Sequence, residues 1–102
     1  MNEVQVKGNQ DGKLTFALAG DIDSVKSEEL YAVVSAEFEK APAPIVFECE
    51  NLDFIDSTTL GTFVKILKAV KTNGFSLAFK NLKPKIKKRF VICSLVTIME
   101  IA

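Results

Sequence analysis

The sequence predicts a mixed α/β fold, with a mostly parallel β-sheet that begins with an antiparallel hairpin and has helices packed on it. Two short segments near the N-terminus alternate apolar and polar residues, and an Asp-Gly pair at residues 11–12 separates them. Downstream, segments with apolar residues at helical spacing alternate with short extended segments. Residues 1–102 are expected to form a single domain, because a chain of 102 residues leaves no room for a second core.

The N-terminal part is expected to hold two strands and one helix. The strands are predicted in residues 4–6 and 14–18. A loop over residues 20–24 leads into the helix, which Ser24 or Ser27 is expected to cap, with two glutamates in its first turn. The apolar stripe of this helix consists of Leu30, Val33, Val34 and Phe38. Two prolines follow and end it, because proline cannot continue a helix.

The middle of the chain is predicted to form a central strand and a second helix. Residues 45–50 are the strand, and residues 51–55 are expected to be a turn with a short extended run. The helix begins in the sequence Asp-Ser-Thr-Thr at residues 56–59, since short side-chain oxygens satisfy the free N–H groups of a helix start. Its apolar face consists of Leu60, Phe63, Val64, Leu67 and Val70. Gly74 is expected to close it as a left-handed cap.

One more strand and one more helix follow. Residues 75–79 alternate as a strand does, and Pro84 opens a basic helix. The inward positions of this helix are Ile86, Phe90 and Cys93. The basic run over residues 83–89 is expected to be mostly solvated, although it would also suit a phosphate or an acidic protein. Residues 95–101 are expected to form a short last strand or an irregular tail.

Composition disfavours several classes of function. Apolar residues make up 48% and charged residues 25%, and the formal net charge is zero. This balance predicts no direct binding of nucleic acid or membrane, and with no signal pattern at the N-terminus the protein is expected to be cytoplasmic. The absence of histidine removes the usual catalytic relays and the commonest metal ligand, so no cofactor or metal is expected. Cys49 and Cys93 lie among apolar neighbours and are expected to be buried, reduced thiols.

Ser57 is the most informative candidate for a functional residue. It falls at the start of the second helix, at the carboxyl edge of the predicted sheet, where sites usually form. The loop with Asp21 and Asp23 is predicted at the same edge. A phosphoryl group on Ser57 would meet free backbone N–H groups and the positive end of the helix dipole, whereas Asp56 would repel it. Helix capping alone also accounts for these residue types.

Four segments resemble the STAS domain family. FIDSTTLGTFVKILKAVKTNGFSLAF resembles the region in which an Asp-Ser pair opens a helix after a strand. LTFALAGDID resembles the strand that ends in Gly-x-Leu/Ile-Asp, and IVFECENLDFIDS resembles the strand that runs into the phosphorylation loop. LKPKIKKRFVICSL resembles the last amphipathic helix. The resemblance covers essentially the whole chain, in the right order.

The resemblance implies a bacterial anti-sigma-factor antagonist that is not itself an enzyme. Ser57 then matches the serine that is phosphorylated in such proteins. The implied partners are an anti-sigma factor with serine kinase activity, whose capture frees a sigma factor for transcription, and a protein phosphatase that reverses the modification. The implied partner-binding residues are Asp21, Ile22, Asp23, Asp56, Ser57, Thr58 and Thr59.

Two positions depart from the family pattern. The family usually has glycine where this chain has Thr59, and another glycine where it has Ser94. The branched side chain at Thr59 would alter which kinase docks, or would offer Thr58 or Thr59 as a competing phosphate acceptor.

Three other functions stay open from the residues. One is a STAS subunit of a transporter or signalling scaffold that binds its partner without phosphorylation. Another is a receiver-type domain in which Asp21 and Asp23 hold Mg²⁺ and Asp56 accepts the phosphate, although a receiver has one strand before its first helix rather than a hairpin. The third is a small thiol enzyme using Cys49 or Cys93, which the apolar surroundings and the missing histidine disfavour.

Overall fold

A five-stranded sheet forms the centre of the computed structural model, which describes residues 3–92 and 100–101. Its strands lie in chain order: β1 (Val4–Gln10), β2 (Lys13–Ile22), β3 (Ile45–Ile55), β4 (Leu77–Lys80) and β5 (Glu100–Ile101). β1 pairs antiparallel with β2, and every later pairing is parallel. The predicted mixed sheet that begins with a hairpin is therefore confirmed.

The hairpin between β1 and β2 turns at the predicted Asp-Gly pair. Asp11 has a φ of 55° and Gly12 a φ of 79°, so both central residues are left-handed, as the tightest hairpin turns require. The Asn9 side chain accepts a hydrogen bond from the Gly12 N–H at 3.0 Å. A bulge between Val6 and Gly8 shifts the register of β1, and Val6 lies 42% exposed.

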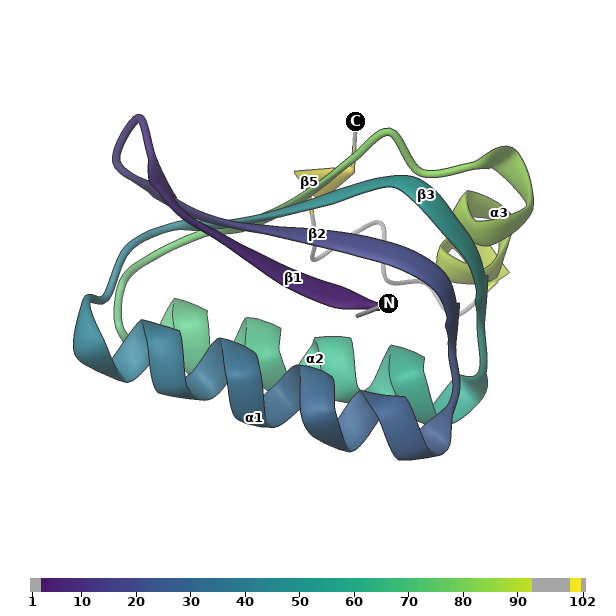
Figure 1. Cartoon of the computed structure of the whole chain (residues 1–102), viewed down its shortest axis with the longest axis horizontal. Helices are drawn as coiled ribbons and strands as arrows, with labels where there is room; N and C mark the ends of the chain where they lie inside the picture. The colour runs from purple at the N-terminus through teal and green to yellow at the C-terminus, as the bar shows by residue number, and fades with distance from the viewer. Residues whose placement is uncertain (1–2, 93–99, 102) are drawn as a thin grey trace.

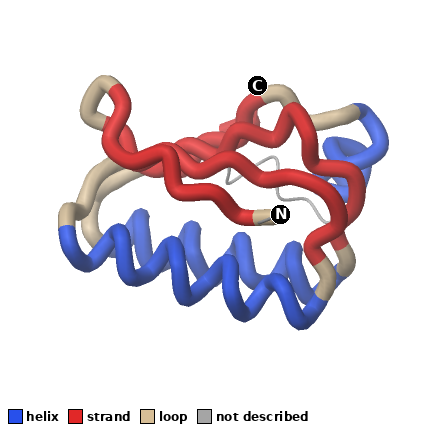
Figure 2. Tube along the Cα trace, in the orientation of Figure 1, coloured by secondary structure: helices blue, strands red, loops and turns tan. Residues whose placement is uncertain are grey.

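Three helices connect or follow the strands: α1 (Ser24–Lys40), α2 (Ser57–Thr72) and α3 (Pro84–Ile92). α1 and α2 lie side by side beneath one face of the sheet, and α3 packs at the end where β3 finishes (Figure 1). Both long helices share a face because successive right-handed crossovers step in one direction across a sheet whose strands keep chain order. In the described part of the chain, no helix covers the opposite face (Figure 2).

A cluster of phenylalanines joins the sheet to α2 and α3. Its members are Phe16, Phe47, Phe63, Phe79 and Phe90, all fully buried. Neighbouring ring centroids lie 4.9–6.0 Å apart, within the range of favourable aromatic pairs, each of which contributes about 0.5–1.5 kcal/mol beyond its buried area. Phe63 of α2 contacts the rings of both β4 and α3, so the cluster fixes the position of α2 on the sheet.

β3 continues through residues 51–55, where the sequence predicted a turn and a short extended run; the extended run is present, and the turn is not. Its pairing with β2 shifts register twice, and both strands bend toward the helix layer (Figure 1). Leu52 and Ile55 are buried, whereas Asp53 and Phe54 between them are exposed. The prediction of a turn was wrong because bulges interrupt the two-residue alternation that marks a strand.

The first helix is capped by Asp23, and the expectation of a serine cap was wrong. The Asp23 carboxylate accepts a hydrogen bond from the Lys26 N–H at 3.1 Å. Ser24 is already helical, and Ser27 is buried with its hydroxyl donating to the Ser24 carbonyl at 2.8 Å. The two glutamates lie beyond the first turn. The helix starts this early because β2 runs on to Ile22 and leaves one residue for the turn.

The remaining elements follow the predictions with small shifts. Four of the five residues predicted for the inner face of α2 are buried, and Val64 is partly buried. The fourth strand begins at Leu77, two residues later than expected. Ile86 and Phe90 of α3 are buried as predicted. Cys93 and residues 95–99 lie outside the described residues.

Cys49 is fully buried in the sheet, as expected for a core thiol. Burial raises the pKa of this thiol to about 12, with a smaller contribution from the neighbouring Glu48. None of the described helices is long and apolar enough to cross a membrane.

Candidate functional site

The carboxyl ends of β2 and β3 bring the two candidate segments together. Ile22, the last residue of β2, is in register with Ile55, the last residue of β3. α1 and α2 begin directly after these strands, so both helix starts lie at the same edge (Figure 1, right). The structure therefore places residues 21–23 beside residues 56–59.

Ser57 is the first residue of α2, and its side chain is exposed. Asp56 precedes it as the N-cap, with extended backbone at φ −103° and ψ −179°. The helix starts here because the Asp56 carboxylate accepts a hydrogen bond from the Thr59 N–H at 2.9 Å. The serine hydroxyl is thus presented to solvent at the positive end of a helix of 16 residues.

The Asp56 carboxylate is held in its ionised form by N–H groups from both helix starts. The Thr59 backbone N–H is the largest cause of its lowered pKa. Desolvation, the next largest effect, opposes it, and the Thr59 hydroxyl, the Ser24 N–H and the Thr58 N–H lower the pKa further. Asp56 therefore occupies a donor that the sequence suggested would be free for a phosphate. A phosphoryl group on Ser57 would have to stay further out, beside a carboxylate.

Two residues predicted for the partner surface have buried side chains. Ile22 and Thr59 are both 0% exposed. The Thr59 oxygen lies 2.6 Å from the Ile22 carbonyl oxygen and 2.9 Å from an Asp56 carboxylate oxygen. In the folded protein, the side chains of Thr59 and Ile22 are therefore not exposed at the predicted partner surface. The sequence held the signal in both cases: Ile22 continues the inward alternation of β2, and Thr59 lies four residues before Phe63 on the inner face of α2.

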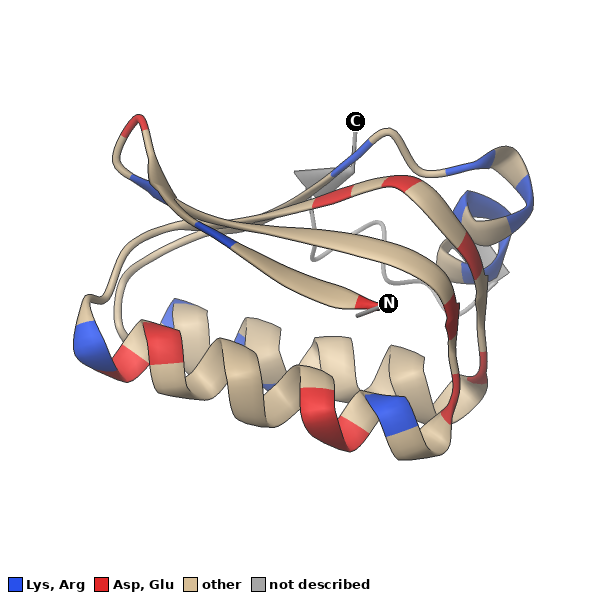
Figure 3. Ribbon diagram, viewed as in Figure 1, with Lys and Arg blue, Asp and Glu red and all other residues tan. Residues whose placement is uncertain are grey.

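The other predicted residues reach the surface. Asp21, Asp23, Ser57 and Thr58 are exposed, and Asp56 is half-buried. Acidic residues recur along the bent ends of β2 and β3, and the basic helix α3 lies beside them (Figure 3). Within the described ranges, no group of three or more His, Cys, Asp or Glu side chains is placed to hold a metal ion.

Two exposed apolar side chains at this edge were not predicted from the sequence. Val25, in the first turn of α1, is 75% exposed, and Phe54, two residues before the cap of α2, is 41% exposed. The Arg89 guanidinium lies 5.4 Å from the centre of the Phe54 ring. The sequence did contain a signal for both: each lies two residues from a helix cap, where an apolar side chain is not expected to reach the core.

Two grooves are lined by residues close to Ser57 in the sequence, Thr58 in one and Ile55 in the other. One, of about 420 Å³, runs between the first turns of α1 and α2 and is lined by Val25, Thr58 and Lys65 among others. The second, of about 380 Å³, lies between the ends of β2 and β3 and α3, and Phe54 and Arg89 contribute to it. Together with the exposed apolar side chains, they give the edge the mixture of apolar and polar groups that protein interfaces use.

These features define a small α/β domain with a solvent-exposed serine at the carboxyl edge of its sheet. The chain belongs to the STAS domain family, whose match spans residues 3–102. A putative anti-sigma factor antagonist of Bordetella bronchiseptica, BtrV, is 28% identical over 92 residues, which cover 90% of this chain and 79% of the relative. The anti-sigma-B factor antagonist of Staphylococcus aureus is 29% identical over 92 residues, covering 90% and 85%.

Two solved structures share the fold. The anti-sigma factor antagonist SpoIIAA in its unphosphorylated form has a TM-score of 0.77 at 18% identity, over 97% of this chain and 86% of that one. The Bacillus cell fate determinant SpoIIAA in its phosphorylated form also has a TM-score of 0.77, at 23% identity, over 97% and 90%. The receiver alternative does not fit this architecture, because receivers have the strand order 2-1-3-4-5 whereas these strands keep chain order.

Proposed function

We propose that this protein is an anti-sigma-factor antagonist controlled by phosphorylation of Ser57. In its unmodified form it binds an anti-sigma factor that is also a serine kinase, and this binding frees a sigma factor for transcription. The curated relatives named above support the class of function. The observation that carries the assignment to this chain is the exposed position of Ser57 at the first residue of α2, at an edge that also holds two grooves and exposed apolar side chains.

The phosphoryl transfer is chemistry of the partner. The Ser57 oxygen attacks the γ-phosphorus of ATP, ADP leaves, and the serine proton passes to a base on the kinase. This chain contributes the acceptor and the docking surface, so it acts as a substrate and regulator rather than as an enzyme. A protein phosphatase hydrolyses the phosphoserine and restores the binding form.

The charge of the phosphate accounts for the difference in partner affinity between the two forms of the protein. Phosphorylation adds about −1.5 to −2 charge units at neutral pH. The Asp56 carboxylate already accepts the Thr59 N–H, so the new charge gains little from that donor and lies next to a like charge. Burying it without partners in an interface costs several kcal/mol. A shift from 99:1 to 1:99 needs about 5.5 kcal/mol of differential affinity, which such a charge can supply.

An anti-sigma-factor antagonist acts in the cytoplasm, where sigma factors meet RNA polymerase. Its direct partners are then proteins rather than nucleic acid or membrane. The exposed Val25 and Phe54 supply apolar contact area at the same edge as the acceptor.

The test is to find where the phosphate goes. The protein is incubated with ATP and the anti-sigma factor kinase that co-purifies with it, and phosphopeptides are mapped. The group is expected on Ser57, with Ser57→Ala unmodified and Thr58→Ala, its exposed neighbour, modified normally. A phosphate on Thr58, or a hydroxylamine-sensitive acyl phosphate on Asp56, would show that the acceptor is misassigned.

A further inference from the structure

The hydroxyl of Thr59 makes a contact that helix capping does not require. Its oxygen lies 2.6 Å from the Ile22 carbonyl oxygen, across 37 residues of sequence, inside a site where Thr59 is 0% exposed. The capping bond itself comes from the backbone N–H of Thr59, which donates to Asp56. The hydroxyl also lies 2.9 Å from the Asp56 carboxylate, but it has a single proton, and its shorter contact is the one with the Ile22 carbonyl. The hydroxyl is therefore available for a different task.

Thr62, in the next turn of α2, shows what an ordinary buried threonine does. Its side chain is 8% exposed, and its hydroxyl donates to the Thr58 carbonyl four residues earlier, at 3.2 Å. That bond stays within α2 and ties the helix to no other element. The Thr59 bond instead joins the start of α2 to the end of β2.

The bond matters because Ile22 lies directly before the start of α1. Ile22 ends β2 and is followed directly by Asp23, the cap of α1. The same Thr59 oxygen also lies 2.9 Å from an Asp56 carboxylate oxygen, so it touches the cap of α2. One hydroxyl thereby connects the starts of both helices, and Ser57 lies two residues away from it.

We propose that the Thr59 hydroxyl is a positioning group: it holds the start of α2 against the end of β2 and so fixes Ser57 relative to the Asp21–Asp23 segment. The inference rests on the proposed function, because it assigns Thr59 a role in presenting the phosphate acceptor. A kinase that binds both segments meets them in one fixed arrangement. Small misplacements of an acceptor cost transfer rate, since the attacking oxygen must lie in line with the phosphorus.

Two matched pairs of proteins isolate the hydroxyl. Wild type and Thr59→Val have the same side-chain shape with and without it. Thr59→Ser and Thr59→Ala share the loss of the methyl group and again differ only in the hydroxyl, so this pair serves if the valine variant does not fold. Thr62→Val is the control for loss of a buried hydroxyl whose bond is local.

The first measurement is amide hydrogen exchange near the two helix starts, at residues 24–27 and 58–60. Exchange is expected to be roughly two- to twelvefold faster in Thr59→Val than in wild type, which corresponds to about 0.5–1.5 kcal/mol for the lost bond. Thr59→Ala should likewise exceed Thr59→Ser. Thr62→Val should leave exchange at residues 24–27 unchanged.

The second measurement is kcat/KM for phosphorylation of Ser57 by the anti-sigma factor kinase. Each variant without the Thr59 hydroxyl is expected to lose on the order of tenfold against its matched partner, while serine at this position restores most of the wild-type rate. Equal exchange within both pairs would overturn the inference. So would faster exchange with unchanged phosphorylation. A wild-type protein that accepts no phosphate would instead overturn the proposed function, while the exchange rates would still decide whether the bond exists.

Discussion

The Asp56 carboxylate accepts a hydrogen bond from the Thr59 N–H at 2.9 Å, and this bond sets the place of Ser57 in the helix. Because Asp56 is the N-cap, Ser57 is the first helical residue and its hydroxyl does not cap the helix. The cap and the proposed acceptor are therefore separate residues. Substitutions can address one without removing the other.

Removing the Asp56 cap is expected to lower stability in a pH-dependent way. The folded pKa of Asp56 lies below its usual value of 3.8, so its stabilisation is fully present above that value and is lost as pH falls through the folded pKa. Asp56→Ala should cost about 1 kcal/mol at pH 7, the typical value of a cap. Urea unfolding of both proteins from pH 7 to pH 2.5 should show this difference shrinking below about pH 4. A difference that stays constant with pH would mean that the ionised carboxylate is not the stabilising form.

The Cys49 thiol is expected to be unreactive in the folded protein. Its pKa of about 12 leaves almost no thiolate at pH 8, and its side chain is fully buried. In a Cys93→Ala background, so that only one thiol is measured, labelling by a maleimide or disulfide reagent should be slow in buffer and fast in denaturant. Fast labelling of the native protein would contradict the burial of Cys49 in the core.

Phe54 and Val25 are expected to contribute to partner binding without supporting the fold. Both are large apolar side chains exposed beside Ser57, at 41% and 75%. Truncating either one to alanine should weaken binding of the anti-sigma factor by about tenfold or more, equivalent to about 1.4 kcal/mol. Val6→Ala is the matched control, since Val6 is similarly exposed but lies on β1 at the edge of the sheet. Equal binding by all three variants would show that Phe54 and Val25 are not part of the interface.

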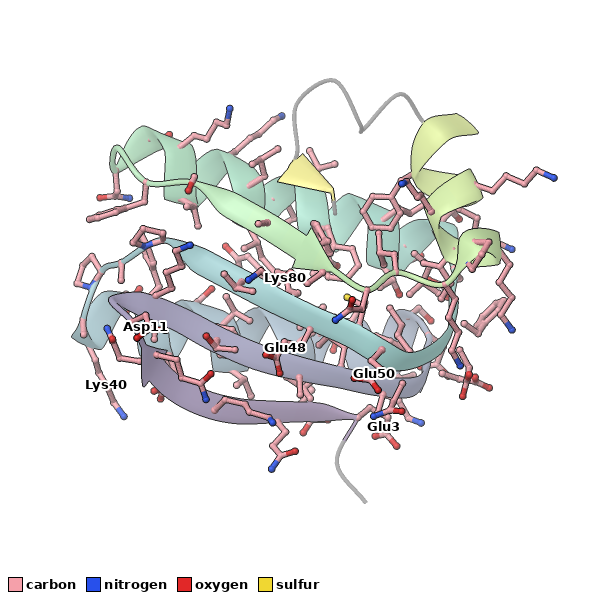
Figure 4. All side chains as sticks on the ribbon, turned by 90° about the horizontal axis from the view of Figure 1, so that it is seen from above. Glu3, Asp11, Lys40, Glu48, Glu50 and Lys80 are labelled. Carbon is pink, nitrogen blue, oxygen red and sulfur yellow. The ribbon has the colours of Figure 1, made fainter. Side chains whose placement is uncertain are left out.

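The face of the sheet opposite α1 and α2 supplies a second control region. Glu48 and Lys80 are paired neighbours on β3 and β4, and both project from this face (Figure 4). Glu48 also forms an ion pair with Lys7 at 3.7 Å. Glu48→Gln and Lys80→Gln are expected to leave binding of the anti-sigma factor unchanged, because the proposed surface lies at the carboxyl edge. A strong loss in either variant, measured by calorimetry, would relocate the interface to this face.

Residue patterns predicted most of the fold, because most of its elements depend on residues that are close together in the sequence. The left-handed turn at Asp11 and Gly12 and the apolar stripe of α2 both follow from residues near one another in sequence. A turn was wrongly predicted within residues 51–55, because the bulges there depend on the pairing of β3 with β2, which no local pattern records. The cap at Asp23 was missed for a related reason, since the length of β2 determines where α1 begins.

The sequence predicted where the candidate site lies, but only some of the side chains that are exposed there. The order of strands and helices was enough to bring Ser57 and Asp23 to one edge. It was not enough to tell which neighbours point outward, because that depends on tertiary contacts such as the Thr59 hydroxyl against the Ile22 carbonyl. The exposure of Phe54 likewise follows from the irregular end of β3.

Charge at position 57 is expected to control partner binding. Ser57→Asp and Ser57→Glu place a carboxylate in the proposed contact, next to Asp56, and should weaken binding strongly. Ser57→Ala keeps the contact uncharged and should bind persistently, because it can no longer be phosphorylated. The fold should tolerate all three: Asp56 is the cap, so alanine removes no capping bond, and a carboxylate in the first turn interacts favourably with the helix dipole.

Calorimetry against the anti-sigma factor measures the effect, and thermal melting checks the fold. The affinities of the alanine and aspartate variants should differ by at least an order of magnitude, with melting temperatures within a few degrees of wild type. Thr58→Asp is the matched control, because it adds the same charge at the next exposed position. If Thr58→Asp weakens binding as much as Ser57→Asp, charge anywhere on the edge is disruptive and Ser57 has no special place. If the alanine and aspartate variants of Ser57 bind equally, the protein binds its partner without phosphorylation control, as a constitutive STAS subunit would.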